Sequence, residues 1–320
     1  GSTCEGSVSK DLSYTPSINS TTNDLGSSTI SDIYDENKDH IGWLWDLKSY
    51  KLPKLYISFD GTVTLDNGRL KKAHPVMRLK ANQINVANTN APSLQLRAAK
   101  VSFYGDNRID DLDIDGCSTV LEKDASLRVK AAKFDSSLNN HGELRGDNIT
   151  ITGSEFYNTG NCEFDDLQAE VQDFTNDGEI DSYNLHLLTH HSFSNSKVMD
   201  SSTMEIVNNG TFAQYGLVKG RDIKLVTADD LINHGKIQSD DQLYIKANNL
   251  INYDNLVAER RVNLDLGTNG IFTNQAKGFS RLYYLNSPSP IKIINHGQGI
   301  RDLDPLLITV LLIAELIMGR

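Results

Sequence analysis

The stretch that decides the fold of this chain reads Leu231-Ile232-Asn233-His234-Gly235-Lys236-Ile237. It places an Asn-x-Gly turn between aliphatic residues. Because Asn and Gly tolerate the positive φ that a sharp corner demands, we predict a tight turn that returns the chain directly to the core. Further copies of the turn begin at Asn140, Asn158, Asn176, Asn208 and Asn295, and degenerate copies begin at Asn252 and Asn274.

An alternating pattern accompanies these turns. It reads apolar-x-apolar-x-small, with another apolar residue three or four positions on, as in Leu243-x-Ile245-x-Ala247-x-x-Leu250. A period of two residues predicts β-strands rather than helices. Other copies start at Met77, Leu94 and Leu127, and weaker ones start at Ile149, Leu167 and Val262.

These copies recur at a nearly constant interval. We place their starts at residues 55, 77, 94, 112, 127, 149, 167, 185, 204, 223, 243, 262 and 282, and the last eight are separated by 18 to 20 residues. That interval is too short for a strand-helix-strand unit of roughly 30 residues. It fits one coil of a parallel β-solenoid with two or three short strands, so we predict an all-β fold.

Four segments follow from this pattern. Residues 1–40 are polar and turn-forming, so we expect a flexible leader. Residues 41–54 hold both tryptophans and are expected to be an N-terminal cap, with an exposed aromatic binding patch as the alternative. Residues 55–300 are expected to form about 13 coils. Residues 301–320 contain an apolar run that fits a C-terminal cap, a truncated hydrophobic region or a membrane-active segment.

The turn and strand pattern resembles the filamentous-haemagglutinin repeat, and Leu231 to Asn252 match it best. The resemblance covers residues 140–300 by motif and residues 55–139 by period and strand pattern. It implies a right-handed parallel β-helix. The family includes two-partner-secreted adhesins and the stalks of contact-dependent inhibition toxins. This chain is less Gly-rich than that family and lacks its recognisable secretion-domain signature.

Composition and charge argue against several classes of protein. The chain has 320 residues, 42 acidic against 31 basic, and a net charge of -11, which argues against a nucleic-acid partner. Three cysteines cannot form a disulfide scaffold. No apolar run reaches the roughly 18 residues of a membrane-spanning helix.

Two polar clusters invite a metal hypothesis. Carboxylates gather at Asp106, Asp110, Asp111, Asp113 and Asp115, as a calcium site would require. Three of them alternate with Leu112 and Ile114, however, which favours a solvated strand face. His141, His234 and His296 each occupy the middle of an Asn-His-Gly turn, several coils apart, and are interpreted as corner residues. The neighbours His190 and His191 are expected to point to opposite faces of a strand.

The cysteines show no C-x-x-C spacing, and we interpret Cys117 and Cys162 as small buried hydrophobes. A disulfide between them would need unusual geometry.

We therefore predict no catalytic, cofactor-binding or metal-ligating residues and no cofactor. The resemblance implies a structural or adhesive module of a secreted or cell-surface bacterial virulence protein, acting by projection and binding rather than as an enzyme. Its expected partners are a receptor or glycan on a host or neighbouring cell, and an outer-membrane transporter during export. The alternative is a carbohydrate-active β-helix enzyme, either a polysaccharide lyase or a tailspike-like depolymerase. A cleft with paired carboxylates would favour the enzyme, and long inner ladders without a polar pocket would favour the adhesin or stalk.

Overall fold

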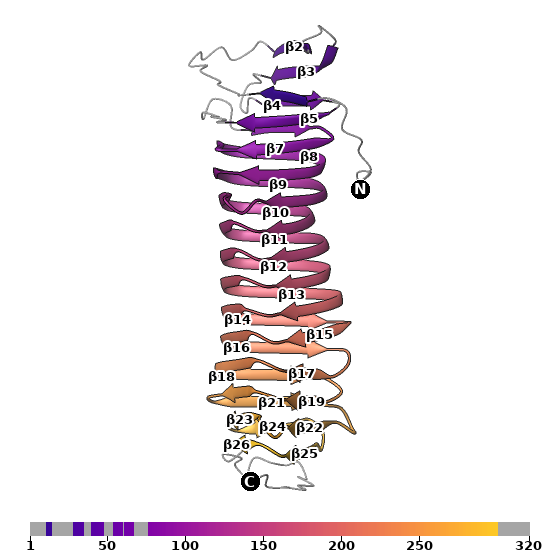
Figure 1. Ribbon diagram of the computed structural model, residues 1–320, viewed down its shortest axis with the longest axis vertical. Helices are drawn as coiled ribbons and strands as arrows, with labels where there is room; N and C mark the ends of the chain where they lie inside the picture. Colours follow the sequence, from indigo (N-terminus) through magenta and orange to yellow (C-terminus); the bar gives the residue numbers. More distant parts are fainter. Residues whose placement is uncertain are drawn as a thin grey trace. The chain divides into compact units, whose positions relative to one another are not determined.

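A computed structural model describes residues 11–14, 28–34, 40–47, 54–59, 61–66 and 76–299. These residues form a β-solenoid, in which parallel strands stack in about 12 coils (Figure 1). The all-β fold class is therefore confirmed, and the coil number is close to the 13 expected. The described residues contain no helix, and so none that could cross a membrane.

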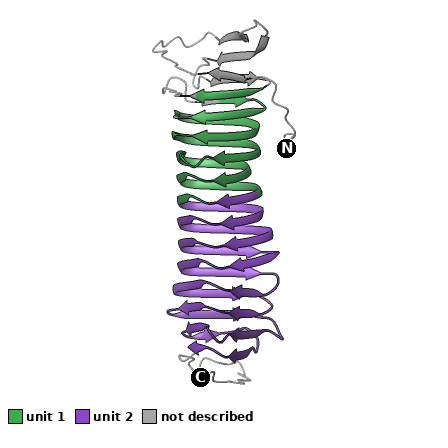
Figure 2. Cartoon of the chain, viewed as in Figure 1, with its two compact units in different colours: residues 1–154, 159–163 green, residues 155–158, 164–320 purple. Residues whose placement is uncertain are grey.

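The chain divides into two compact units (Figure 2). Unit 1 comprises residues 1–154 and 159–163, and unit 2 comprises residues 155–158 and 164–320. The strands of unit 1 are β1 (Asp11–Tyr14), β2 (Ser28–Tyr34), β3 (His40–Leu47), β4 (Lys54–Phe59), β5 (Thr62–Asp66), β6 (Val76–Lys80), β7 (Gln83–Ala87), β8 (Asn90–Tyr104), β9 (Asp106–Leu121) and β10 (Ser126–Asn140). Strands β11 (Glu143–Asn158) and β12 (Asn161–Asn176) have residues in both units.

The remaining strands lie in unit 2. They are β13 (Glu179–Asn195), β14 (Val198–Asn208), β15 (Thr211–Gln214), β16 (Leu217–Thr227), β17 (Leu231–Asn233), β18 (Lys236–Lys246), β19 (Leu250–Asn252), β20 (Asn255–Ala258), β21 (Arg261–Asp265), β22 (Ile271–Asn274), β23 (Phe279–Leu282), β24 (Leu285–Asn286), β25 (Lys292–Asn295) and β26 (Gln298–Gly299).

Each coil of unit 2 has three straight segments joined by three corners. In β13 the segments are residues 179–182, 184–189 and 192–195, which pair in parallel with successive parts of β14 and β15. Apolar side chains at alternate positions point inward. One column of such residues consists of Leu185, Met204, Ile223, Leu243, Val262 and Leu285. Of the two or three strands per coil that the period allowed, the structure has three.

A phenylalanine column packs on another face of the core. The ring centroids of Phe156 and Phe174 are 5.4 Å apart, those of Phe174 and Phe193 are also 5.4 Å apart, and those of Phe193 and Phe212 are 4.7 Å apart. The first three side chains are at most 1% exposed. Burying each ring contributes about 1.5–3 kcal/mol.

A ladder of buried amides occupies one corner of unit 2. Each Asn donates a 2.9 Å hydrogen bond to the amide oxygen of the next coil, first along Asn158, Asn176, Asn195 and Gln214, and then along Asn233, Asn252, Asn274 and Asn295. The same amides donate to backbone carbonyls of the turn. Buried polar groups are costly unless they are paired, so this corner is stable only as a stack.

The glycines of these turns are required for a different reason from the one expected. Gly235 does not have a positive φ, and positive φ among the described glycines occurs at Gly61, Gly105, Gly267 and Gly299. A Cβ on Gly235 would instead lie 2.1 Å from the carbonyl oxygen of Gly216 in the preceding coil. The turn therefore needs glycine because the two backbones approach closely.

The turn predicted at Asn208 is present, but it lies at a different corner from the amide ladder. Its pairing partners are Thr189 and Thr227, which lie between the second and third segments of the coil. Thr189 donates a 2.7 Å hydrogen bond to Asn208, which in turn donates to Thr227 at 3.2 Å. The Asn-x-Gly letters are shared by two corners, so the motif alone could not separate them. In the coil of Thr189 the residue of the amide ladder is Asn195, and in the coil of Asn208 it is Gln214.

Two of the expected repeat starts are also wrong. In unit 1, Leu127 pairs with Asn107, and the residue that aligns with Leu112 is Ala132. In unit 2, Leu282 pairs with Ala258, and the residue that aligns with Val262 is Leu285. Apolar and polar residues alternate in every segment of a coil. In the sequence, a strand from one segment therefore looks the same as the start of a repeat in another segment.

The first strands differ from the rest. β2 pairs antiparallel with β3, and β3 pairs antiparallel with β4, whereas β4 pairs in parallel with β6. Strands β1 and β2 thus lie in the segment expected to be a flexible leader. The expected cap or hydrophobic segment at residues 301–320 lies outside the described residues.

Candidate functional site

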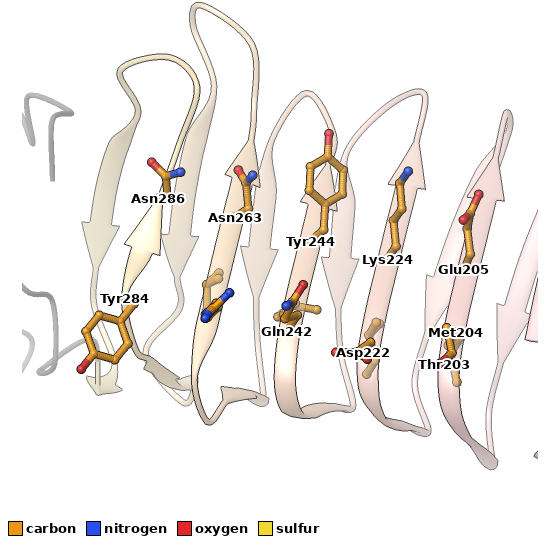
Figure 3. Close-up of a pocket in the computed structure, with 14 residues that line it drawn as sticks. Thr203, Met204, Glu205, Asp222, Lys224, Gln242, Tyr244, Asn263, Tyr284 and Asn286 are labelled. Atoms are coloured by element: carbon orange, nitrogen blue, oxygen red, sulfur yellow. The ribbon is translucent and has the colours of Figure 1, made fainter. Parts of the chain in front are cut away.

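A groove of about 1120 Å³ lies on the outer face of unit 2, across strands β14, β16, β18, β21 and β24 (Figure 3). Its lining consists of Thr203, Met204, Glu205, Asp222, Ile223, Lys224, Gln242, Leu243, Tyr244, Arg261, Val262, Asn263, Tyr284 and Asn286. This groove is a polar pocket, the feature whose absence would have favoured the adhesin or stalk over the enzyme.

Two rows of outward side chains form the walls of this groove. One row consists of Glu205, Lys224, Tyr244, Asn263 and Asn286, which lie in register on successive strands (Figure 3). The other row consists of Thr203, Asp222, Gln242 and Arg261. The buried column that includes Met204 and Leu243 runs between the two rows. Strand alternation therefore produces the groove, because it turns every second side chain outward.

An irregular corner keeps the rows aligned. Between Gly220 and Asp222 the pairing of β16 with β18 shifts by one residue, so β18 has one residue more than β16 at this corner. Arg221 forms an ion pair with Asp241 at 3.6 Å there. Because the register resumes at Gln242, its side chain stays in the row of Asp222.

Electrostatics differ along the groove. The ammonium group of Lys224 lies 5.4 Å from the ring centroid of Tyr244, within the range of a cation–π interaction. The Tyr244 hydroxyl donates a 3.5 Å hydrogen bond to Asp265. Burial, and then the nearby Asp265 charge, raise the pKa of Tyr244, so the phenol remains a protonated donor. Glu205 lies 4.0 Å from His186.

Several polar groups of the groove form no ion pair or no hydrogen bond with the described residues. Among the described residues, no carboxylate pairs with Lys224 or Arg261. Asp222 Oδ1 and Asn263 Oδ1 accept no hydrogen bond in the same part of the chain. At one end of the groove, Tyr284 is 55% exposed and has a φ of 46°. A positive φ is rare for an aromatic residue, and residues with such a backbone conformation cluster at functional sites.

An exposed aromatic stack follows the amide ladder of unit 2. The ring of His234 lies between those of Tyr215 and Tyr253, with centroid distances of 4.7 Å and 4.6 Å. His234 and His296 are exposed corner residues, and His141 in unit 1 lies 2.7 Å from the Thr159 hydroxyl. The corner interpretation of these three histidines is confirmed.

His190 and His191 do not point to opposite faces of a strand. Both are exposed, because they form a corner where the alternation of the strand is interrupted. His190 lies 2.9 Å from Glu170, and His191 lies 2.6 Å from Asp173. The hydrogen bonds from Ser192 and then from His191 lower the pKa of Asp173.

The acidic cluster lies on a solvated face, as the alternation with Leu112 and Ile114 predicted. Those two side chains are buried, while Asp111, Asp113 and Asp115 are exposed or half-exposed. Arg97 lies 3.4 Å from Asp113 and 3.9 Å from Asp115, and Lys130 lies 3.9 Å from Asp110. These cations come from the neighbouring coils and could not be matched to the cluster from the sequence. Across the described residues, no group of three His, Cys, Asp or Glu side chains could hold a metal ion.

The two cysteines in the described region differ. Cys162 is a buried free thiol, as expected, and burial raises its pKa to about 12. Cys117 is not a buried free thiol but is half-buried and disulfide-bonded. The exposure and the disulfide pairing of each cysteine depend on its place in a coil, and the spacing of the cysteines in the sequence does not show that place.

Comparisons with known proteins found no matching family model, curated protein or solved structure.

Proposed function

We propose that this chain is a structural and adhesive surface module that binds its target through the groove of unit 2. The observation that carries the proposal is a groove on the outer face of a ladder-built core, lined by tyrosines, amides and two cations that form no ion pair with the described residues. Such a surface offers ring faces and fixed hydrogen-bonding groups to an extended, hydroxyl-rich chain. A glycan or a receptor on another cell fits this chemistry.

The core supports a role in projection. The amide and phenylalanine columns of unit 2 pair each coil with the next, so the outward rows are held in fixed register. A binding surface on a rigid support loses little conformational entropy when it binds. The groove therefore does not need to be ordered by its ligand.

The repeat and the disulfide support a secreted or cell-surface bacterial protein. Its repeat resembles that of filamentous-haemagglutinin adhesins and toxin stalks, which act outside the cell. Cys117 is disulfide-bonded, and disulfides persist mainly in oxidising compartments. An outer-membrane transporter for export is part of the same proposal.

Binding without turnover is the test of this proposal. The labelled chain should bind intact cells or members of an immobilised glycan panel, and the recovered glycans should be chemically unchanged. Absence of binding to every cell type and glycan tested would overturn the proposal.

A carbohydrate-active enzyme is the second candidate, and the groove provides an observation in its favour. Glu205 and Asp222 are carboxylates on neighbouring strands of one groove. Glycoside hydrolysis uses two carboxylates on either side of the scissile bond. Incubation with pectin-like polyuronates and neutral glucans, followed by assays for new reducing ends and unsaturated uronate, tests this candidate. Turnover that disappears in Asp222→Asn would establish the enzyme and remove the purely adhesive proposal.

A further inference from the structure

A second candidate site lies in unit 1 and shares no residue with the groove of unit 2. A hollow of about 580 Å³ opens on the outer face of β8, β9, β10 and β11. Three arginines contribute to its lining, Arg108, Arg128 and Arg145, together with the acidic residues Asp106 and Glu143. The hollow shares no residue with the acidic face of Asp111, Asp113 and Asp115.

Two of these arginines are direct neighbours in the stack. Arg108 on β9 pairs with Arg128 on β10, so the two positive charges lie in adjacent coils, about 4.8 Å apart along the stack. Like charges placed directly opposite each other on a sheet destabilise it. Both side chains are exposed.

Neither arginine of the pair forms an ion pair within the described part of the chain. Arg145, by contrast, forms an ion pair with Glu163 at 3.6 Å. Two unpaired guanidinium groups thus converge on one hollow, while the third is already neutralised.

We propose that Arg108 and Arg128 together bind a single tetrahedral oxyanion, the sulfate or phosphate ester group of an otherwise uncharged sugar. Guanidinium groups donate two parallel hydrogen bonds to such oxygens. The hydroxyl of Ser126, in the same lining, adds a neutral donor. The column spacing lets one anion bridge two neighbouring coils.

The surrounding acids restrict the ligand to an isolated anionic group. Asp106 lies on β9 two residues before Arg108, and Glu143 precedes Arg145 on β11. A uniformly charged polyanion would place its other groups against these carboxylates. A neutral sugar chain that carries one ester avoids this repulsion. The two carboxylates therefore favour a ligand with few sulfate or phosphate esters over one with many.

The test is a titration of the full chain with small ligands. Isothermal titration calorimetry measures binding, and the thermal unfolding midpoint is measured with and without each ligand. The probes are inorganic sulfate, inorganic phosphate, glucose 6-sulfate, glucose 6-phosphate and glucose, and the sulfate and phosphate arms distinguish the two esters. We expect the esters to bind and to raise the midpoint, glucose to do neither, and Arg128→Gln to weaken ester binding roughly tenfold or more. Lys123→Gln removes the same charge from an exposed residue outside the hollow and should change nothing.

A second readout separates binding from folding. Without ligand, Arg128→Gln should unfold at a higher temperature than wild type, since it removes the repulsion between the two arginines. Unchanged ester binding by Arg128→Gln, or equal binding of glucose, would overturn the proposal. So would the absence of any ester binding by wild type. Arg128→Gln and Lys123→Gln both leave the lining of the unit 2 groove intact, so the difference between the two variants reports on the hollow alone and leaves the adhesive proposal untouched.

Discussion

Replacement of Asn176 by alanine tests the amide ladder most sharply. The Asn176 side chain is fully buried, and its nitrogen donates to Asn195 Oδ1 at 2.9 Å, to the Gly178 carbonyl at 3.1 Å and to the Val198 carbonyl at 2.9 Å. Its oxygen accepts from the Asn158 amide at 2.9 Å and from the Gly178 N–H at 3.2 Å.

Alanine leaves the Gly178 N–H and the Asn195 Oδ1 without these partners and removes one bond from the Val198 carbonyl. The Gly178 carbonyl retains a bond from the Val198 N–H at 3.1 Å, and the Asn158 amide retains a bond to the Glu179 carbonyl at 3.2 Å. Each orphaned group costs about 1–3 kcal/mol, so we expect the free energy of unfolding to fall by about 2–6 kcal/mol.

Equilibrium urea unfolding followed by circular dichroism measures this change, once unfolding and refolding traces overlap. Asn209→Ala is the matched control, because Asn209 is exposed at a neighbouring corner, and it should change stability by less than ~0.5 kcal/mol. A loss below ~1 kcal/mol for Asn176→Ala, which is under the cost of one orphaned group, would refute the reasoning that the ladder stabilises the stack.

Three further predictions concern the core, the surface and the thiol. Phe193→Ala should lower the free energy of unfolding by about 3–5 kcal/mol, since it opens a cavity inside the ring stack, whereas Phe193→Leu should cost less; urea unfolding of the two variants checks both. The pKa of Asp173 is lowered in the folded state, so its carboxylate stabilises the protein above the unfolded pKa of ~3.9, and this contribution is lost as pH falls through the lower folded pKa. Asp173→Asn should therefore be less stable than wild type at neutral pH and equal to it in strong acid, and a constant difference in unfolding midpoint across that range would contradict the assignment. Cys162, with a pKa raised to about 12, should resist iodoacetamide in the native protein and react in urea, as mass spectrometry of the peptide would show.

The sequence was sufficient to predict the solenoid but not its corners. The alternation around Leu243 and the interval of 18 to 20 residues identify stacked parallel strands, since both depend on local residue choice. Assigning a strand to one of three segments requires the length of each corner. The predicted starts at Leu127 and Leu282 are wrong for this reason, and the turn motif at Asn208 could not show which corner it occupies.

The candidate groove could not be predicted from the sequence at all. Glu205, Lys224 and Tyr244 are separated by 19 and 20 residues, and each one alone reads as an ordinary exposed strand residue. They become one wall only because the extra residue of β18 is absorbed at the corner near Asp241. The arginine pair of unit 1 is hidden in the same way, since its register depends on pairing between β9 and β10.

Binding of the full chain to intact cells, compared among three proteins, tests the central claim most directly. Tyr244→Ala combined with Arg261→Gln alters the groove, while Arg260→Gln removes the same positive charge from the adjacent turn outside the lining. Circular dichroism should show that all three proteins keep the fold. We predict that wild type and Arg260→Gln bind equally and that the groove variant loses most of the binding. Equal binding by all three proteins would contradict the assignment of the groove as the adhesive surface.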